Sequence, residues 1–338
     1  MKQLIFAIAT AVCLAITALA NAQGPQPITS KEVKQSVETL IRQMNDNYIF
    51  PEVAKEAEAM LQNNLKKGTY KNLTDGKLLA EKLTADLRAL VKDRHLGVYY
   101  HPVQKNEKAP DAEAQKTGYD AWWHRMSRQN LGFPKAEILE GNIGYLKVMG
   151  FGPVDKVGPT CSAAVSFLAN TDAMIIDLRH NGGGEPALVQ YLVSHFFEGS
   201  PIHINDIVYR KDNKVEEYWT LPTLNATRYL NKPVYILTDS RTFSGGEEFA
   251  YDMQVLKRAT LIGETTGGGA NPGDEANLGN GFHAFIPNGR AVNPITKTNW
   301  EGTGVAPDIS VKAEAALKEA HVMALQKLLA GATNTDIK

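Results

Sequence analysis

The sequence contains very little cysteine. Only Cys13 and Cys161 occur among its 338 residues, and Cys13 lies within the first 22 residues. Those residues have the pattern of a secretory signal peptide, with one cation at Lys2, an apolar run and the small-residue site Ala20-Asn21-Ala22. Cleavage after Ala22 leaves Cys161 without an intrachain partner, which excludes a disulfide scaffold. The mature chain must therefore be stabilised by a buried core.

An excess of charge of either sign is also lacking. The chain has 36 Lys and Arg against 37 Asp and Glu, and removal of residues 1–22 takes away one lysine and no acid. This balance gives no indication of nucleic-acid or anionic-membrane binding. The N-terminal apolar run is short for a membrane span and contains Thr10 and Thr17. We therefore expect an exported protein, periplasmic or extracellular, with no integral membrane span in the mature chain. Its oligomeric state is left open.

Motifs for metals and nucleotides are absent as well. The sequence has no HExxH and no cysteine-rich pair, so we expect no metal. Its triple glycine, Gly182-Gly183-Gly184, matches neither GxGxxG nor the phosphate loop GxxxxGK[ST]. We therefore expect no organic cofactor.

Hydrophobic periodicity divides the mature chain into three parts. In residues 23–95 apolar side chains recur three and four positions apart, which predicts a small helical domain. Residues 96–140 are predicted to be a linker or a flexible excursion, because residues 101–135 within them are polar and show no clear periodicity. In residues 141–338 short apolar strands alternate with helices, which predicts an α/β core with a mainly parallel sheet.

Ser244 opens a predicted helix in the stretch TDSRTFSGGEEFAYDM, residues 238–253. The run Ser244-Gly245-Gly246-Glu247 matches the S-x-x-E capping box, in which serine and glutamate satisfy backbone N–H groups at a helix start. A serine in this position can also act as a nucleophile, because the following backbone N–H can form half of an oxyanion hole. The glycine segment 182–184 can supply the other half. The pattern alone leaves both roles of the serine open.

A serine nucleophile needs a base, and eight histidines are available. His95 lies where the helical part ends, His180 lies beside the triple glycine, and His283 lies in a strand-like apolar segment. Spacing along the chain cannot choose among them, because the members of a catalytic triad meet in space.

Five ordered blocks resemble the signature of the tail-specific protease superfamily, the S41 serine peptidases. They are DRHLGV, IIDLRHNGGG, TFSGGEEFA, LIGETTGGGANPG and NWEGTGVAPDI. The block IRQMNDNYIFPEVAKEAEAML also resembles the helical N-terminal domain of the branch related to interphotoreceptor retinoid-binding protein. The resemblance implies an α/β fold with a crotonase-like, ClpP-like β/α core and a small N-terminal helical domain. The catalytic domain is then expected over residues 141–338.

The resemblance also implies catalytic roles. Ser244 becomes the nucleophile and Gly245 the oxyanion donor after it. Gly183 is implied as the second donor, with Gly182 beside it. The tricorn-like branch uses a histidine base oriented by a glutamate, and these positions fall on His95 and Glu301.

Two positions depart from relatives in this superfamily. C-terminal processing peptidases carry a lysine base where this chain has Gly269, so the Ser-Lys dyad is missing. We expect this glycine-rich loop to need a positive φ at Gly269. Arg94 stands where the tricorn type has a serine assisting the histidine, which changes the charge around the base.

The resemblance further implies a substrate class. Only about 40 residues separate the DRHLGVYYH block from ILEGNIGYLKV, fewer than a PDZ domain needs. Without that domain there is no dedicated grip on substrate C-termini, so we expect endopeptidase or oligopeptide cleavage of peptides or unfolded proteins. The alternative is a non-catalytic carrier of apolar small molecules, retinoid-like or lipid-like, because the retinoid-binding relatives use this fold as carriers.

Overall fold

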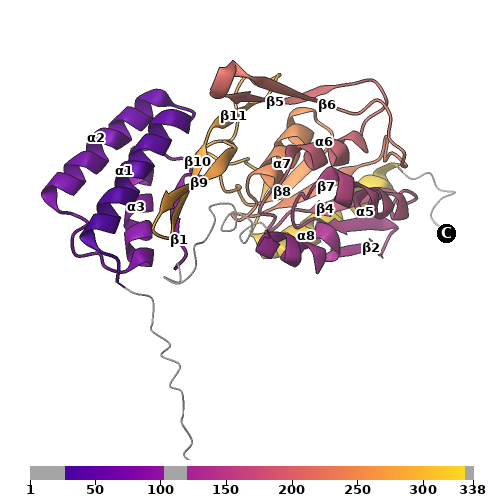
Figure 1. Cartoon of the computed structure of the whole chain (residues 1–338). Coiled ribbons are helices and arrows are strands. Elements are labelled where there is room, and N and C mark those ends of the chain that lie inside the picture. Colours follow the sequence, from indigo (N-terminus) through magenta and orange to yellow (C-terminus); the bar gives the residue numbers. More distant parts are fainter. Residues whose placement is uncertain (1–26, 103–119, 332–338) are drawn as a thin grey trace, which may run out of the picture.

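The structure is a computed structural model that describes residues 27–102 and 120–331. The expected signal peptide, residues 1–22, lies outside the described residues. Figure 1 shows a helical lobe at one end of the molecule and a larger α/β lobe at the other, with a strand ribbon between them. Among the described helices, none is both long and apolar enough to cross a membrane.

The N-terminal lobe consists of three amphipathic helices, α1 (Ser30–Asn47), α2 (Pro51–Lys67) and α3 (Gly76–Leu90). Helix α1 begins at a capping box between Thr29 and Glu32, and α2 ends at Gly68 in the left-handed conformation. The helices share a hydrophobic core with an antiparallel sheet of order β1-β10-β9. Its strands are β1 (Gly97–Tyr100), β9 (Gly273–Gly279) and β10 (Phe282–Pro287). Strands from late in the sequence therefore complete the N-terminal lobe.

The central sheet of the α/β lobe has the order β12-β8-β7-β4-β3-β2, and every neighbouring pair is parallel except β2 with β3. In spatial order its strands are β12 (Ile309–Ser310), β8 (Thr260–Gly263), β7 (Val234–Thr238), β4 (Ala173–Asp177), β3 (Ile143–Lys147) and β2 (Lys135–Leu139). Strands β4 and β7 are buried along their whole length, as expected for parallel strands covered on both faces.

Helices cover both faces of the central sheet. Helices α5 (Val154–Phe167), α6 (Pro186–Ser194) and α7 (Gly245–Val255) share the main hydrophobic core with one face. Helix α8 (Ala313–Gly331) packs a stripe of small residues, Ala316, Ala320 and Ala324, on the other face. Cys161 lies fully buried in the main core, where burial raises the pKa of its thiol.

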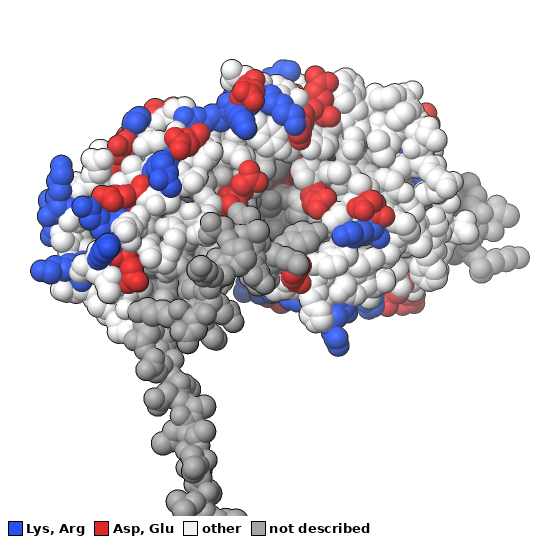
Figure 2. All heavy atoms as spheres, in the orientation of Figure 1, with Lys and Arg blue, Asp and Glu red and all other residues white. Residues whose placement is uncertain are grey.

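A second antiparallel sheet, of order β11-β5-β6, extends from the α/β lobe toward the helical lobe (Figure 1). It contains β5 (His203–Tyr209), β6 (Val215–Trp219) and β11 (Gly289–Val292), with a 3₁₀ turn at Lys211–Asn213 in the hairpin. On the face drawn in Figure 2, charges of both signs are interspersed over the helical lobe and the tip of this hairpin. The hairpin tip and the helical lobe therefore form a charged rim on that face.

The segment expected as a linker, residues 96–140, contains regular structure. Strand β1 pairs with β10 through Gly97↔Phe285 and Tyr100↔Phe282, and β2 forms the edge of the central sheet. Residues 120–127 form a helix, and Asn130–Gly132 form a 3₁₀ turn. Residues 103–119 lie outside the described residues. The pairing of β1 joins residues about 185 positions apart, which local periodicity does not reveal. The domain boundaries stay a prediction.

Two carboxyl groups lie buried on the face of α7 next to β5. Asn205 Nδ2 donates to Glu248 Oε1 at 3.0 Å, and a side-chain hydrogen bond from Asn293 favours the anion of Asp252. Burial raises the pKa of Glu248 to about 7, and burial followed by the charge of Glu248 raises that of Asp252. Each group is thus more easily protonated in the folded than in the unfolded chain.

We predict that this pair makes the protein less stable as pH rises. A carboxyl whose folded pKa lies above its unfolded value contributes stability at low pH, and that stability is lost as pH rises from about 4.5 through about 7. The Tm should be several degrees higher at pH 5 than at pH 8, measured by calorimetry. Glu248→Gln should reduce this difference, whereas Glu319→Gln on the exposed face of α8 should not. An unchanged pH dependence in Glu248→Gln would contradict the assignment.

Candidate active site

The site lies at the carboxyl ends of the central strands β4 and β7, where ligands bind in open α/β sheets. The loop after β4 contains Asn181 and the triple glycine, and the loop after β7 leads to Ser244. The two loops are joined by a hydrogen bond in which Phe243 N–H donates to Asn181 O at 2.9 Å. Both glycine-rich segments expected from the sequence therefore meet at one place.

Ser244 lies at the turn between the β7 loop and α7, with φ 52° and ψ −124°. A non-glycine residue with positive φ in such a region is strained, by about 1–3 kcal/mol, and persists only where the surrounding structure enforces it. The serine is also the N-cap of α7, and its N–H donates to Glu247 Oε2 at 2.9 Å. The capping box expected from the sequence is present. A sharp strand-to-helix turn that presents a serine is typical of hydrolase nucleophiles.

The triple glycine packs directly against this turn. A Cβ on Gly183 would lie 2.6 Å from Ser244 Cβ and 2.7 Å from Gly245 N, so only glycine fits there. The Gly183 N–H, implied above as the second oxyanion donor, donates instead to Asn181 Oδ1 at 2.8 Å. The Gly183 N–H can donate to an oxyanion only if its hydrogen bond to Asn181 is broken first. Gly184 N also lies close to the start of α7, 3.2 Å from a Cβ built on Gly245. Gly182 is exposed.

Glu247 connects the turn at Ser244 to a second loop, which follows β8. Besides the N–H of Ser244, its buried carboxylate accepts hydrogen bonds from Thr266 Oγ1 at 2.5 Å, Gly268 N at 2.6 Å and Gly269 N at 2.8 Å. Burial raises the pKa of Glu247, and these donors oppose that shift. The sequence suggested only the capping role for this residue.

His95 lies over the Gly269 loop and beside Phe243, which precedes Ser244. Its imidazole packs on Phe243, with ring centroids 4.5 Å apart, and on Phe285 at 5.7 Å. Burial, followed by the positive charge of Arg88, lowers the pKa of His95 to about 4. The ring is therefore neutral at physiological pH, which a general base requires. Among the described residues no hydrogen bond joins His95 to Ser244 Oγ, as is common before substrate binds.

Two carboxyl groups lie beside this histidine. One ligand atom each of Asp93, His95 and Glu301 lie within 4.8 Å of one another. His95 Nδ1 and Glu301 Oε1 are both buried without a hydrogen-bond partner among the described residues. The other carboxylate oxygen of Glu301 accepts from Ala270 N at 2.6 Å.

The charges around Glu301 shift its titration. Burial, then the charge of Asp93 and that of Glu247, raise the pKa of Glu301 to about 8. Burial also raises the pKa of Asp93, against four hydrogen bonds that favour its anion. A carboxylate with raised proton affinity next to a neutral imidazole is a pair that shares one proton over the neutral pH range.

A divalent metal is a poor fit to these three residues. Both oxygens of Asp93 already accept two hydrogen bonds each, from His95 N and Leu96 N on Oδ1 and from Tyr48 and Asn271 on Oδ2. His95 and Glu301 alone would then offer fewer protein ligands than zinc sites use.

The two other histidines considered from the sequence have different surroundings. His180 is half-exposed, with Nδ1 2.8 Å from Asp239 Oδ2 and Nε2 3.0 Å from Arg241 Nη2. His283 lies in β10, with Nδ1 3.2 Å from Glu275 Oε1. Arg94 donates to Gly267 O at 2.6 Å and lies over the Phe243 ring at 5.8 Å, so it anchors the loop beneath His95.

Gly269 fills the position of the missing lysine. A Cβ there would overlap the Phe243 ring and lie 2.7 Å from His95 Cε1. The expected positive φ belongs to its neighbour Gly268, at 82°, and Gly269 itself does not have one. The requirement for glycine at 269 is therefore steric, because the histidine and the phenylalanine occupy the space that a side chain would need.

Gly269→Lys is accordingly expected to impair the protein. Overpacking of this kind costs about 1–3 kcal/mol, and displacement of His95 should lower the rate of peptide hydrolysis by at least about a hundredfold. The measurements are the Tm and kcat/KM. Gly158→Ala is the matched control, because a Cβ there meets nothing nearer than 3.7 Å. A gain in rate from Gly269→Lys would indicate a site still built for a Ser-Lys dyad.

Comparison with solved structures shows the fold. The chain is similar to mature CPAF, with a TM-score of 0.60 at 12% identity over 88% of this chain and 96% of that one. A peptidase candidate from Parabacteroides merdae matches with a TM-score of 0.57 at 21% identity, over 87% and 96%. The photosystem II D1 C-terminal processing protease matches with a TM-score of 0.51 at 15% identity, over 85% and 95%. The α/β fold with a crotonase-like, ClpP-like core is thereby confirmed.

Sequence profiles of protein families identify the chain more closely. The profile described as peptidase family S41 matches residues 142–311, which is half of the chain. The profile of the N-terminal domain of this family in eukaryotic IRBP matches residues 15–122. These matches cover both lobes and include the loops that carry Ser244 and Glu301. The protein is therefore a serine-type peptidase that belongs to peptidase family S41.

Proposed function

We propose that this peptidase is an exported endopeptidase or oligopeptidase in which Ser244, His95 and Glu301 form the catalytic triad. The observation that carries the proposal is the strained turn at Ser244, whose neighbour Phe243 packs against a half-buried, neutral histidine with an unpaired glutamate oxygen beside it. Strain and unpaired buried polar atoms are costly, so their occurrence together favours a catalytic role over a purely structural one.

The reaction follows from these positions. Ser244 Oγ attacks the carbonyl carbon of the peptide bond while its proton passes to His95 Nε2. Glu301 accepts a hydrogen bond from Nδ1–H and stabilises the imidazolium. The negative oxygen of the tetrahedral intermediate accepts a hydrogen bond from Gly245 N–H and from a backbone N–H of the triple glycine. The imidazolium then protonates the leaving amine. A water molecule, deprotonated by His95, hydrolyses the acyl-enzyme.

The proposed substrate is a peptide or an unfolded protein cleaved without preference for its C-terminus. Between β1 and β2 the described residues form one short helix and a 3₁₀ turn, and the whole segment is too short for a PDZ domain. Export rests on the signal-peptide pattern of residues 1–22.

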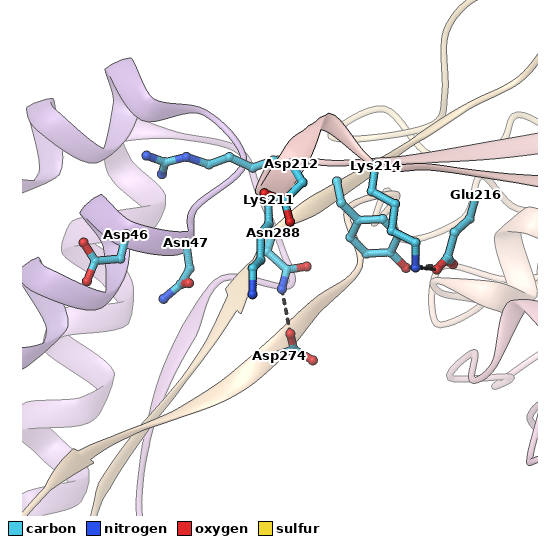
Figure 3. Close-up of a pocket in the computed structure, with 10 residues that line it drawn as sticks. Asp46, Asn47, Lys211, Asp212, Lys214, Glu216, Asp274 and Asn288 are labelled. Carbon is cyan, nitrogen blue, oxygen red and sulfur yellow. Dashed lines mark hydrogen bonds and ion pairs between the residues drawn. The ribbon is translucent and has the colours of Figure 1, made fainter.

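The alternative role, a carrier of apolar small molecules, finds little support in the cavity of Figure 3. This cavity, of about 860 Å³, is lined mainly by charged and amide side chains, among them Asp46, Lys211 and Asp274. An apolar ligand would leave such groups without water or partners.

Labelling with a fluorophosphonate tests the proposal against this alternative. The purified mature protein should be modified at one residue, Ser244, identified by peptide mass spectrometry. The control is protein unfolded in denaturant, which should not react. Native protein that remains unlabelled would favour the carrier.

A further inference from the structure

Tyr48 brings the helical lobe into contact with the proposed base. It follows the last turn of α1 and is fully buried, and its hydroxyl donates to Asp93 Oδ2 at 3.2 Å. Burial, followed by the charge of Asp93, raises the pKa of Tyr48, so the hydroxyl keeps its proton and remains a donor.

Asp93 in turn holds the backbone of His95. Its Oδ1 accepts from His95 N at 3.1 Å and from Leu96 N at 3.3 Å, which fixes the turn that presents the imidazole. Its Oδ2 accepts from Tyr48 and from Asn271 Nδ2, the latter at 3.0 Å. Asp93 thus connects the hydroxyl of Tyr48 to the backbone of His95 through two hydrogen bonds.

The backbone of Tyr48 is held from two further directions. Arg210, at the end of β5, donates through Nη1 to Tyr48 O at 2.8 Å, and Ile49 N donates to Pro287 O at 2.8 Å. Arg210 also lines the cavity of Figure 3, which lies between Asn47 on the helical lobe and Lys214 on the hairpin. The helical lobe, the hairpin and β10 therefore all meet at Tyr48.

From these contacts we infer that Tyr48 is a positioning residue, through which the helical lobe orients His95 by way of Asp93. The inference rests on the proposed function, because it assigns His95 the role of base. The hydroxyl has a second effect, since it favours the anion of Asp93 within a cluster that must also hold the anion of Glu301. Charged groups that act on this cluster are Glu247, beneath the Gly269 loop, and Arg88, on α3.

The test is Tyr48→Phe, which removes one oxygen and keeps the ring. We expect the maximal rate of fluorophosphonate labelling, kinact, to fall about tenfold to a hundredfold, because the proposed base is displaced. The inhibitor constant KI should stay unchanged, because binding of the fluorophosphonate is not affected. The acid limb of the pH profile should move to higher pH, because loss of a donor raises the proton affinity of the carboxyl pair. If Tyr48 had a purely structural role, its replacement would change neither the acid limb of the pH profile nor the kinact of the folded protein.

Tyr70→Phe is the matched control. Tyr70 is also buried in the helical lobe, and its hydroxyl donates to a carboxylate, Asp86 Oδ2, at 2.8 Å, within the helical lobe. It should lower the Tm about as much as Tyr48→Phe and leave kinact and the acid limb unchanged. Equal kinetic losses in both variants, or none in Tyr48→Phe, would overturn the inference.

A second variant covers the case in which Tyr48→Phe does not fold. Asp93→Asn can still accept from His95 N but carries no charge, so it should move the acid limb to lower pH, opposite to Tyr48→Phe. If Asp93→Asn leaves the acid limb of the pH profile in place, the inferred connection between Asp93 and His95 is wrong. Wild-type protein that is not labelled at Ser244 would instead refute the proposed function, so the two failures are distinguishable.

Discussion

Ser244→Ala should abolish peptide hydrolysis and fluorophosphonate labelling while the protein remains folded. Removal of a catalytic nucleophile costs at least about a thousandfold in rate. The backbone strain at φ 52° stays the same in alanine, so the stability change should be limited to the lost cap, about 1 kcal/mol, or a few degrees in Tm. The measurements are kcat/KM on a fluorogenic peptide and the Tm from calorimetry.

The matched control is Ser162→Ala. Ser162 also contacts a histidine, with Oγ 3.2 Å from His195 Nε2 and 2.7 Å from the hydroxyl of Tyr191, but it lies inside α5 and not at a glycine-rich turn. This variant should retain its rate and its labelling. A Ser244→Ala protein that cleaves peptides at a comparable rate would refute the hydrolytic mechanism proposed here.

His95→Ala should remove nearly all activity, because His95 is the proposed acceptor of the proton from Ser244. We expect a loss of about a thousandfold or more in kcat. In wild-type protein the rate should rise with pH, since the active form has neutral His95 and ionised Glu301. The midpoint should lie near the higher of the two pKa values, about 8, because the active form appears only when the second proton leaves the pair.

Three variants test this assignment further. His180→Ala and His283→Ala should retain most of the rate, because their side chains pair with Asp239 and Glu275. Glu301→Gln should lower kcat by a large factor through loss of imidazolium stabilisation. A His180→Ala protein as inactive as His95→Ala would mean that the wrong histidine had been chosen.

The sequence predicted the features that depend on local pattern. The helix that starts at Ser244, the glycine loop beside it and the alternation of strands and helices follow from periodicity and capping chemistry. The choice of His95 came from the resemblance, because its neighbours Phe243, Phe285 and Glu301 are distant in the sequence. The family was predicted and is confirmed, and the roles of the individual residues stay predictions.

The contributions of Asp93, Glu247 and Tyr48 could not be predicted in this way. Each acts through hydrogen bonds to backbone groups or side chains from other loops, and no local pattern encodes such partners. The S-x-x-E box revealed that Glu247 lies at a helix start but not that it also binds Gly268 and Gly269. Similarly, β1 was not predicted as a strand because its partner, β10, lies near the other end of the chain.

The close packing of His95 over Gly269 also constrains how such a site can evolve. A side chain at 269 collides with the imidazole, and a chain without that imidazole lacks the proposed base. A lineage that exchanges a histidine base for a lysine base, or the reverse, must therefore pass through an intermediate that is either crowded or inactive. The two positions are expected to change together, or after a gene duplication that relaxes selection on one copy.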